Sequence, residues 1–443
     1  MAVAQDVRRN LDLDAALAEA ERRYLADNPG SVARLEHAKA SLPGGNTRSV
    51  LHYAPCPLTM ARGRGCRVWS LDGGEYIDFL GEYTAGLYGH SNPAIMAAMK
   101  RALDDGVVLG APNVYEARLA EALCARFPSL ERVRFCNSGS EADLMLLLLA
   151  RAVTGRAKVL AFDAAYHGGF LIFGHGGSPL NVPIPMVIAR YNDLDGTRAL
   201  IDEHADELAA VILEPMLGAG GCIPAGPGFL EMLRAETARH GILLVFDEVI
   251  TSRLSTGGLQ ARLGVTPDLT ALGKYLGGGS SFGAFGGRAD LMDRFDPASP
   301  DCLYHSGTFN NDVLTMAAGH AGLTEVLSAE ALAALNARGE ALRGALSAYF
   351  ADQGLAMTAT GLGSLMAIHF RPGPIAAPAD LEGEDPRLKQ LFHLAMLARG
   401  IYLSPRGMLA LSLPMGAAET DALLEAVGAF VEDYGPLLPR AGA

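Results

Sequence analysis

The sequence predicts an α/β fold built on a mostly parallel sheet, and the observations that predict it lie between about residues 92 and 325. Short, continuous apolar runs recur there, and helical patterns separate most of them. Strands that are apolar on both faces are typical of a parallel sheet covered by helices on each side. The expected strands are residues 132–136, 158–162, 185–189, 210–214, 242–246 and 269–272, with 282–288 as a further strand of opposite sense.

The segments on either side of this stretch predict a smaller α+β part. Residues 12–27 and 31–40 carry helical signals, and CRVWSLDGGEYIDFL alternates around a turn that predicts a hairpin. After residue 330 we expect a long helix, the strand SLMAIHF, a second helix, the strand MLALSL and a last helix. The domain limits that follow are 1–75 for an N-terminal arm and part of the small domain, 76–328 for the large domain and 329–443 for the C-terminal small domain.

Composition and charge narrow the class of function. The 443 residues are half hydrophobic and carry a formal net charge of −13, which argues against a broad surface for nucleic acid or anionic membrane. The N-terminus lacks the apolar core of a signal peptide, and the apolar run 144–150 is too short to span a membrane. Six cysteines without C-x-x-C spacing or a Cys/His cluster predict a cytoplasmic protein with reduced thiols and no metal site.

The first candidate site follows the expected strand 132–136, where Ser138-Gly139-Ser140 opens an apolar helix. Free N–H groups, hydroxyls and the positive end of the helix dipole together suit a phosphate. The alternative is an ordinary helix start with Ser138 or Ser140 as the N-cap. The turn is neither a P-loop nor G-x-G-x-x-G, because the required lysine and glycines are absent.

Two charged positions follow later strands at the same end of the sheet. Asp247 closes strand 242–246, where open α/β sheets place ligands, and a carboxylate there can hold a ring nitrogen protonated. Lys274 stands among small and apolar residues that would lower the pKa of its amine, as Schiff-base chemistry requires. The alternative for Asp247 is that it forms a solvated pair of acids with the adjacent Glu248. The alternative for Lys274 is an ordinary loop lysine whose amine reaches water.

Three further motifs complete the set. Tyr166 offers an aromatic face, Glu214 ends another strand, and Thr308 offers a hydroxyl beside a glycine. Each has an ordinary structural explanation when taken alone. In their order along the chain, the motifs describe a phosphate cup, a stacking ring, a carboxylate for a pyridine nitrogen and an amine for an imine. These are the parts of a pyridoxal phosphate site.

At these residues the chain resembles the class III (subgroup II) aminotransferases, in the branch shared with glutamate-1-semialdehyde aminomutase. The phrase FDEVITSRL followed by LGKYLGGG carries the resemblance, which runs from about PGGNTRS to SLPMG. Within that branch, GEYTAGLYGHS, HSGTFNN and SPRG look most like the aromatic β-amino acid (β-phenylalanine) aminotransferases. The resemblance implies the pyridoxal phosphate-dependent transferase fold type I, with a seven-stranded, mostly parallel sheet and a smaller α+β domain formed by both chain ends.

The same resemblance implies roles for the candidate residues. Lys274 would form the internal aldimine with pyridoxal 5′-phosphate (PLP) and then carry the proton. Asp247 would pair with the pyridinium nitrogen, Tyr166 and Val249 would cover the two ring faces, and Glu214 would lie near the phenolic oxygen. The phosphate would be held by Ser138, Gly139, Ser140 and Thr308 of the partner subunit. A homodimer with shared active sites is therefore expected. The cup reads Ser-Gly-Ser where the family usually has Ser-Gly-Thr.

Substrate contacts are expected from two loops. The resemblance puts Arg48 and Arg406 at the pocket, and arginine clamps carboxylates through paired hydrogen bonds. Tyr83 and Tyr88 can line its aromatic side. The expected reaction moves the amino group of a β-amino acid to 2-oxoglutarate or pyruvate in ping-pong order. An aminomutase acting within one molecule is the nearest alternative, and a nicotinamide-dependent oxidoreductase is disfavoured because no G-x-G-x-x-G follows the first strand.

Overall fold

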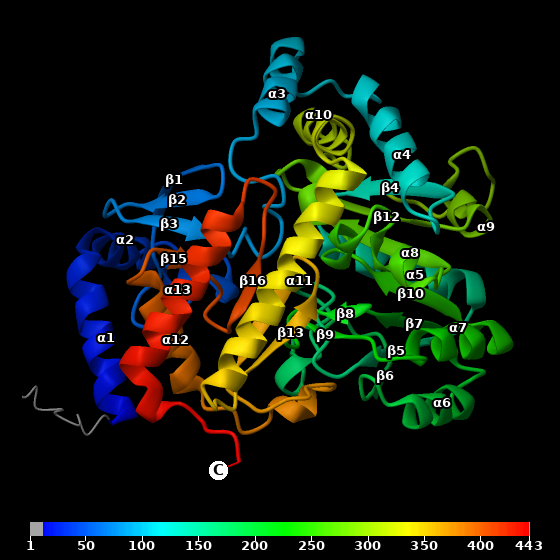
Figure 1. Cartoon of the computed structure of the whole chain (residues 1–443). Helices are drawn as coiled ribbons and strands as arrows, with labels where there is room; N and C mark the ends of the chain where they lie inside the picture. The colour runs from blue at the N-terminus through cyan, green and yellow to red at the C-terminus, as the bar shows by residue number, and fades with distance from the viewer. Residues whose placement is uncertain (1–11, 443) are drawn as a thin grey trace, which may run out of the picture.

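A seven-stranded sheet forms the centre of the computed structural model, which describes residues 12–442 (Figure 1). In spatial order its strands are β4 (Arg132–Cys136), β12 (Gly283–Gly287), β11 (Leu269–Gly273), β10 (Leu243–Asp247), β7 (Leu208–Leu213), β5 (Lys158–Phe162) and β6 (Met186–Ala189). β12 runs antiparallel to both of its neighbours, and the remaining pairs are parallel. This confirms the predicted α/β fold, including the strand of opposite sense. The N-terminal residues on which the signal-peptide expectation partly rests, 1–11, lie outside the described chain.

Helices cover both faces of this sheet because its strands are apolar on both sides. Val245 of β10 packs on one face with Leu146 and Leu147 of α5 (Gly139–Thr154). Its neighbours Leu244 and Phe246 point to the other face, toward α7 (Phe229–His240) and α6 (Leu194–Glu203). The other helices of this part are α3 (Pro93–Asp105), α4 (Val114–Arg126), α8 (Gly258–Leu263), α9 (Ala289–Met292) and α10 (Val313–Ala321).

The two ends of the chain build the smaller part together. β1 (Met60–Arg64), β2 (Arg67–Ser70) and β3 (Glu75–Asp78) form an antiparallel ribbon, and β15 (Ile401–Tyr402) joins β3 in parallel. A second sheet of this part consists of β13 (Thr358–Leu362), β14 (Leu365–His369) and β16 (Met408–Ala410). The two-stranded pair of β8 (Met216–Leu217) and β9 (Ile223–Pro224) belongs instead to the segment between β7 and α7. The predicted hairpin and the α+β part made of both chain ends are confirmed. The domain limits after residues 75 and 328 stay predictions.

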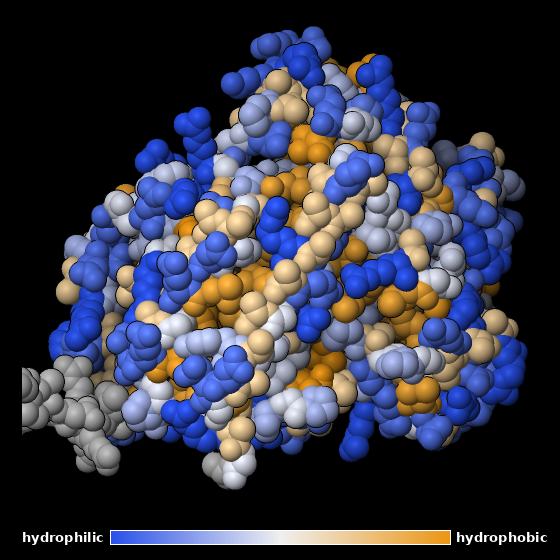
Figure 2. Space-filling model, viewed as in Figure 1, coloured by the Kyte–Doolittle hydropathy of each residue, from blue (hydrophilic) through white to orange (hydrophobic). Residues whose placement is uncertain are grey.

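Five helices pack around these small sheets. They are α1 (Leu13–Asp27), α2 (Pro29–Lys39), α11 (Ala329–Asp352), α12 (Pro386–Leu397) and α13 (Ala417–Tyr434). The long helix α11 runs across the middle of the view, between the smaller part and the seven-stranded sheet (Figure 1). Polar and charged residues cover most of this face, and hydrophobic residues show between the helices (Figure 2). Among the described helices, none has the length and apolarity needed to cross a membrane.

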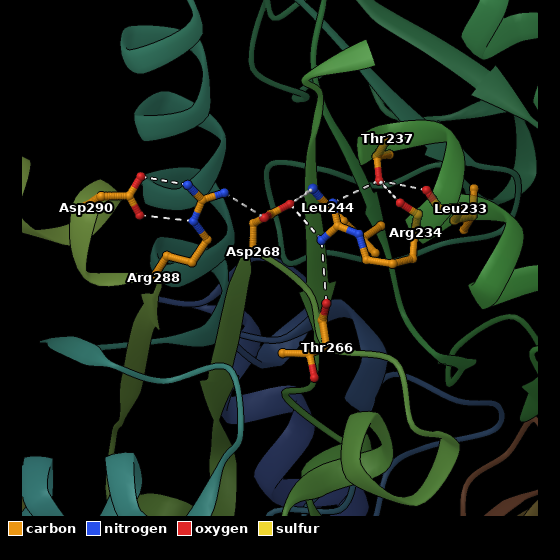
Figure 3. A network of polar contacts seen from close by, with 8 residues as sticks. All are labelled: Leu233, Arg234, Thr237, Leu244, Thr266, Asp268, Arg288 and Asp290. Atoms are coloured by element: carbon orange, nitrogen blue, oxygen red, sulfur yellow. Dashed lines mark hydrogen bonds and ion pairs between the residues drawn. The ribbon is translucent and has the colours of Figure 1, made fainter. Parts of the chain in front are cut away.

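A network of charged side chains connects the amino ends of β10 and β11 in the large sheet (Figure 3). The buried Asp268, just before β11, accepts hydrogen bonds from Arg234 Nη1 at 2.9 Å and Arg288 Nη1 at 3.0 Å. It also accepts the N–H of Leu244 in β10 at 2.8 Å, and Arg288 in turn pairs with Asp290. Both oxygens of the buried carboxylate are thereby satisfied. The network holds the amino ends of β10 and β11, leaving their carboxyl ends to carry the site.

Candidate active site

The carboxyl ends of the parallel strands bring five predicted residues to one end of the sheet. Ser138 follows β4, Tyr166 follows β5, Glu214 follows β7, Asp247 ends β10 and Lys274 follows β11. Parallel α/β sheets present ligand sites at this end. The residues predicted from separate sequence motifs therefore lie together in the folded chain.

Lys274 begins a short 3-10 turn and is mostly enclosed by protein. Its φ is +57°, a left-handed conformation that residues other than glycine rarely adopt and that clusters at functional sites. Burial lowers the pKa of Lys274 to about 8, against the opposing negative charges of Asp247 and Glu214. An appreciable share of the amine is therefore neutral near neutral pH, as a nucleophile or proton carrier requires.

Asp247 is buried and firmly held, so it is not the solvated acid that the sequence left open. Its Oδ2 lies 2.8 Å from Nδ1 of His167, and its Oδ1 accepts the N–H of Val249 at 3.0 Å. The next residue, Glu248, is also buried but has a different task, because it accepts the N–H groups of Leu259 and Gln260 at the start of α8. Of the two adjacent acids, only Asp247 faces the other site residues.

The Ser-Gly-Ser turn has the geometry of both interpretations offered by the sequence. Ser138 is the N-cap of α5, because its hydroxyl accepts the N–H of Glu141 at 3.2 Å. Ser140 accepts the N–H of Gly169 at 3.1 Å, and a Cβ at Gly168 would lie 2.1 Å from its hydroxyl oxygen. The turn after β5 can thus approach α5 only because position 168 is glycine.

Val249 sits between two glycines. A Cβ built at Gly139 would lie 2.8 Å from one of its methyl groups, and a Cβ built at Gly273 would lie 3.2 Å from the other. Both distances are shorter than normal contacts between carbon atoms. The position of the valine side chain therefore depends on the absence of two methyl groups, one at the first residue of α5 and one at the end of β11.

Glu214 and Tyr166 are joined through the backbone. Glu214 accepts the N–H of Tyr166 at 3.1 Å on one oxygen and the N–H of Gly218 at 2.9 Å on the other. Desolvation, together with the negative charge of Asp247, raises the pKa of Glu214 to about 7. Tyr166 is 45% exposed, so its ring is accessible to a flat ligand.

Arg48 and Arg406 meet at a single tyrosine. Their guanidinium carbons lie 5.7 and 5.5 Å from the ring centroid of Tyr83, within range of a cation–π interaction. Arg48 forms an ion pair with Glu82, whereas no carboxylate of residues 12–442 pairs with Arg406. Glu82, Tyr83 and Thr84 all have positive φ, so this turn is an unusual backbone conformation that presents Tyr83 to both arginines.

Two predicted residues do not join this group within one chain. Tyr88 is buried in the hydrophobic core against Tyr275, with ring centroids 6.0 Å apart, so within one chain it does not lie with the other predicted pocket residues. Thr308 is exposed, and its segment is held to the Ser-Gly-Ser turn by a 3.0 Å hydrogen bond from Asn137 to Asn310. Its expected role with the phosphate depends on a second copy of the chain.

The sequence analysis missed Glu82, Asp143, His167 and Arg253. Arg253 is fully buried, donates to the carbonyl of Thr84 at 3.1 Å and also bonds the carbonyl of Leu411. It therefore ties the turn that carries Tyr83 to the smaller part of the chain. Arg253 lies in the quoted phrase FDEVITSRL, and His167 directly follows the predicted Tyr166, so their neighbours in sequence were the available signal.

Comparison with known proteins identifies the family. The model of the family described as Aminotransferase class-III matches residues 50–173 and 179–431. The chain belongs to the class III aminotransferases. This class III aminotransferase is 52% identical over 429 residues to "Beta-phenylalanine transaminase" of Variovorax paradoxus, covering 97% of this chain and 99% of the relative. The family resemblance read from the motifs is thereby confirmed.

Solved structures give the same family and fold. A β-phenylalanine aminotransferase from Variovorax paradoxus superimposes with a TM-score of 0.96, covering 97% of this chain and 100% of that one. An ω-transaminase from Sphaerobacter thermophilus is 40% identical, with a TM-score of 0.87 and coverage of 92% and 99%. A glutamate-1-semialdehyde aminomutase from Pseudomonas aeruginosa, 24% identical with a TM-score of 0.86 and coverage of 94% and 98%, shares the fold.

Proposed function

We propose that this class III aminotransferase moves the amino group of an aromatic β-amino acid to 2-oxoglutarate or pyruvate, with PLP as cofactor. One observation carries the proposal: the partly neutral amine of Lys274 and the buried carboxylate of Asp247 lie at neighbouring strand ends, beside the N-terminus of α5. The 52% identity to a protein named β-phenylalanine transaminase supports the substrate class.

The described residues fit PLP. The first turn of α5, with Ser138, Gly139 and Ser140, offers N–H groups and hydroxyls to a phosphate. Asp247 accepts two hydrogen bonds from the protein, and a carboxylate has about four acceptor positions, so capacity remains for a ring N–H. When bound, PLP would supply an electron sink that takes the amino group from the donor and returns it to the keto acid in ping-pong order.

The chain's own residues would then position the reactants and move the proton. The neutral amine of Lys274 is the base that can take a proton from the donor carbon and return it. Asp247, which is held by His167, would keep a ring nitrogen protonated. As the family resemblance implies, Tyr166 and Val249 would confine a flat ring from its two faces, and Glu214 would lie near its phenolic side.

Arg48 and Arg406 are proposed to bind the carboxylates of the two substrates. Arg406 has no competing carboxylate among the described residues, so we infer that it is the readier of the two to accept one. Arg48 must first leave Glu82, which makes it an adjustable contact. An enzyme that binds a β-amino acid and then a dicarboxylic keto acid needs both kinds of site, because the positions of the carboxylates differ.

We further propose that the enzyme is a homodimer with shared active sites. Val108 and Tyr304 are 86% and 88% exposed, and Asn113 donates to the carbonyl of Asn311 at 2.7 Å, which joins their two segments. Exposed apolar residues on adjoining segments favour a protein interface. A second copy covering them would bring Thr308 of the partner subunit toward the phosphate site. Analytical ultracentrifugation is expected to show a dimer, and a fully active monomer would contradict the shared site.

The free cysteines support a cytoplasmic location. All six remain unbridged thiols, and four of them are buried. Structural disulfides are common in exported proteins and rare in the reducing cytoplasm.

The function is tested by incubating the purified enzyme with 3-amino-3-phenylpropanoate, 2-oxoglutarate and PLP and measuring glutamate. We expect glutamate to form in proportion to the β-amino acid consumed, with pyruvate and alanine as the second pair to assay. Absence of glutamate and alanine, together with turnover of an amino aldehyde, would favour the aminomutase instead.

The same assay tests whether the arginines bind the substrate carboxylate. For this, 1-phenylethylamine, an amino donor without a carboxylate, is compared with the β-amino acid. Arg406→Lys is expected to lower kcat/KM for the β-amino acid roughly 10- to 100-fold, the cost of losing a charge-assisted, two-point contact. The amine without a carboxylate should be unaffected. Equal losses for both donors would show that Arg406 supports the loop rather than the substrate. Arg48→Lys serves as the matched variant on the other loop.

A further inference from the structure

We propose that Asp143 is a positioning residue that carries a proton in the folded protein and donates it in a hydrogen bond to Asp247. Through this contact it would set the basicity of the carboxylate that holds the ring nitrogen of the cofactor. The second half of this inference rests on the proposed function, whereas the proton on Asp143 does not.

The first step is the placement of Asp143. Asp143 lies in the second turn of α5 and is 1% exposed. Its Oδ1 has no hydrogen-bond partner in the described part of the chain. Asp143, His167 and Asp247 each offer an atom within 4.8 Å of the others, and Asp143 is within hydrogen-bonding reach of Asp247. Two carboxyl groups thus share a space from which water is excluded.

The second step is the balance of charge around Asp143. The groups that act on it are Asp247, Glu214 and Lys274, and His167 completes the cluster through Asp247. One lysine amine faces three buried carboxyl groups, and His167 gives its Nδ1 proton to Asp247 alone. A single lysine cation cannot balance three buried carboxylates, so full ionisation of the neighbouring pair is unfavourable. Burial and the charge of Asp247 raise the pKa of Asp143 well above its ordinary value.

The third step concerns Asp247. It accepts hydrogen bonds from the N–H of Val249 and from His167, and the hydroxyl of a protonated Asp143 would be a third donor. Each donor stabilises the carboxylate and lowers its affinity for a further proton. With three donors in place, one acceptor position is left for the ring nitrogen. Asp143 would thus weaken the hold of Asp247 on the ring proton without touching the cofactor.

The test compares Asp143→Asn with wild type in the cofactor-free, chelator-treated protein. Asparagine keeps the size and the donor but cannot ionise. A carboxyl whose pKa is raised by folding is neutral in both states at low pH, so its contribution is then fully favourable. As the pH rises from the ordinary aspartate pKa toward the folded one, only the unfolded chain releases the proton, and wild type loses stability relative to the variant.

We expect the Tm advantage of Asp143→Asn to grow by about 1–4 °C between about pH 5 and about pH 8. The infrared difference spectrum, wild type minus variant, should contain the carbonyl band of one protonated carboxylic acid, because any band from Glu214 is common to both proteins and cancels. Parallel Tm curves and an unchanged spectrum would overturn the proposal. So would a chelator-sensitive stability of wild type that the variant lacks, because the three side chains would then be cation ligands.

The effect on Asp247 is read in the holoenzyme from the pH midpoint of the cofactor's visible absorbance. Asp143→Leu removes the donor, so this midpoint should shift away from that of wild type, and Asp143→Asn should restore it. A midpoint that is the same in all three proteins would overturn the role toward Asp247. Failure to bind PLP at all would count against the proposed function, while the cofactor-free measurements would still decide the protonation of Asp143.

Discussion

Replacement of Lys274 by alanine is expected to abolish transamination, lowering kcat/KM by roughly 10⁴-fold or more. No other lysine can take its place. The chain has five, and three of the others form ion pairs with glutamates elsewhere: Lys39, Lys158 and Lys389. The fourth, Lys100, lies on α3. The loss should appear in kcat, because the amine moves the proton and the substrate arginines remain in place.

Two controls separate chemistry from folding in this variant. The Tm of the cofactor-free variant should not fall below that of wild type. In wild type the burial of the lysine amine, which lowers its pKa, is itself unfavourable. Small amines added to the Lys274→Ala enzyme should restore part of the turnover, since they supply the missing base. Full turnover without added amine would contradict the proposed role, as would a borohydride-fixed pyridoxyl mass on any peptide other than that of Lys274 in wild type.

Replacement of Asp247 by asparagine should lower kcat by roughly 10²–10³-fold, the usual cost of removing one electrostatic contact from a reacting centre. The amide keeps the shape of the side chain and can still accept from the N–H of Val249. It carries no charge, so it cannot keep a ring nitrogen protonated, and His167 loses its anionic partner. Steady-state kinetics and the visible absorbance of the bound cofactor both report this change.

The neighbouring acid provides the matched control. Glu248→Gln removes a charge one residue away, but from a carboxylate that binds the start of α8. We expect this variant to lose thermal stability and to keep the kcat of wild type. If the two variants lose activity alike, burial of the acid pair rather than the charge of Asp247 would explain the effect.

Sequence patterns predicted the large sheet well for a physical reason. Its strands are covered on both faces, so they appear as continuous apolar runs that differ clearly from the helices between them. β13 escaped prediction because its sequence TATGL has neither a continuous apolar run nor strict alternation. β15 has two residues, which is too short for any periodicity.

The site was predictable where the chemistry lies directly after a strand. Lys274 and Asp247 could be predicted from the end of a strand and the local motif alone. The fold then brings the ends of such strands together. Asp143 was missed because its neighbour, Asp247, is about a hundred residues away in sequence. Arg253 was missed for a similar reason, since its partners belong to distant segments. The burial of Tyr88 in the core was not predictable, because the motif around it does not indicate which way its ring points.

The valine held between Gly139 and Gly273 limits how this enzyme can diversify. A methyl group on either glycine would clash with the side chain of Val249 and displace it, so a substitution at any one of the three positions disturbs the other two. The side chains of Arg48 and Arg406 are not confined in this way, because both residues are exposed and their guanidinium groups lie near the ring of Tyr83. We therefore expect specificity for new amine donors to arise by substitutions around Arg48 and Arg406, while Gly139, Val249 and Gly273 stay unchanged.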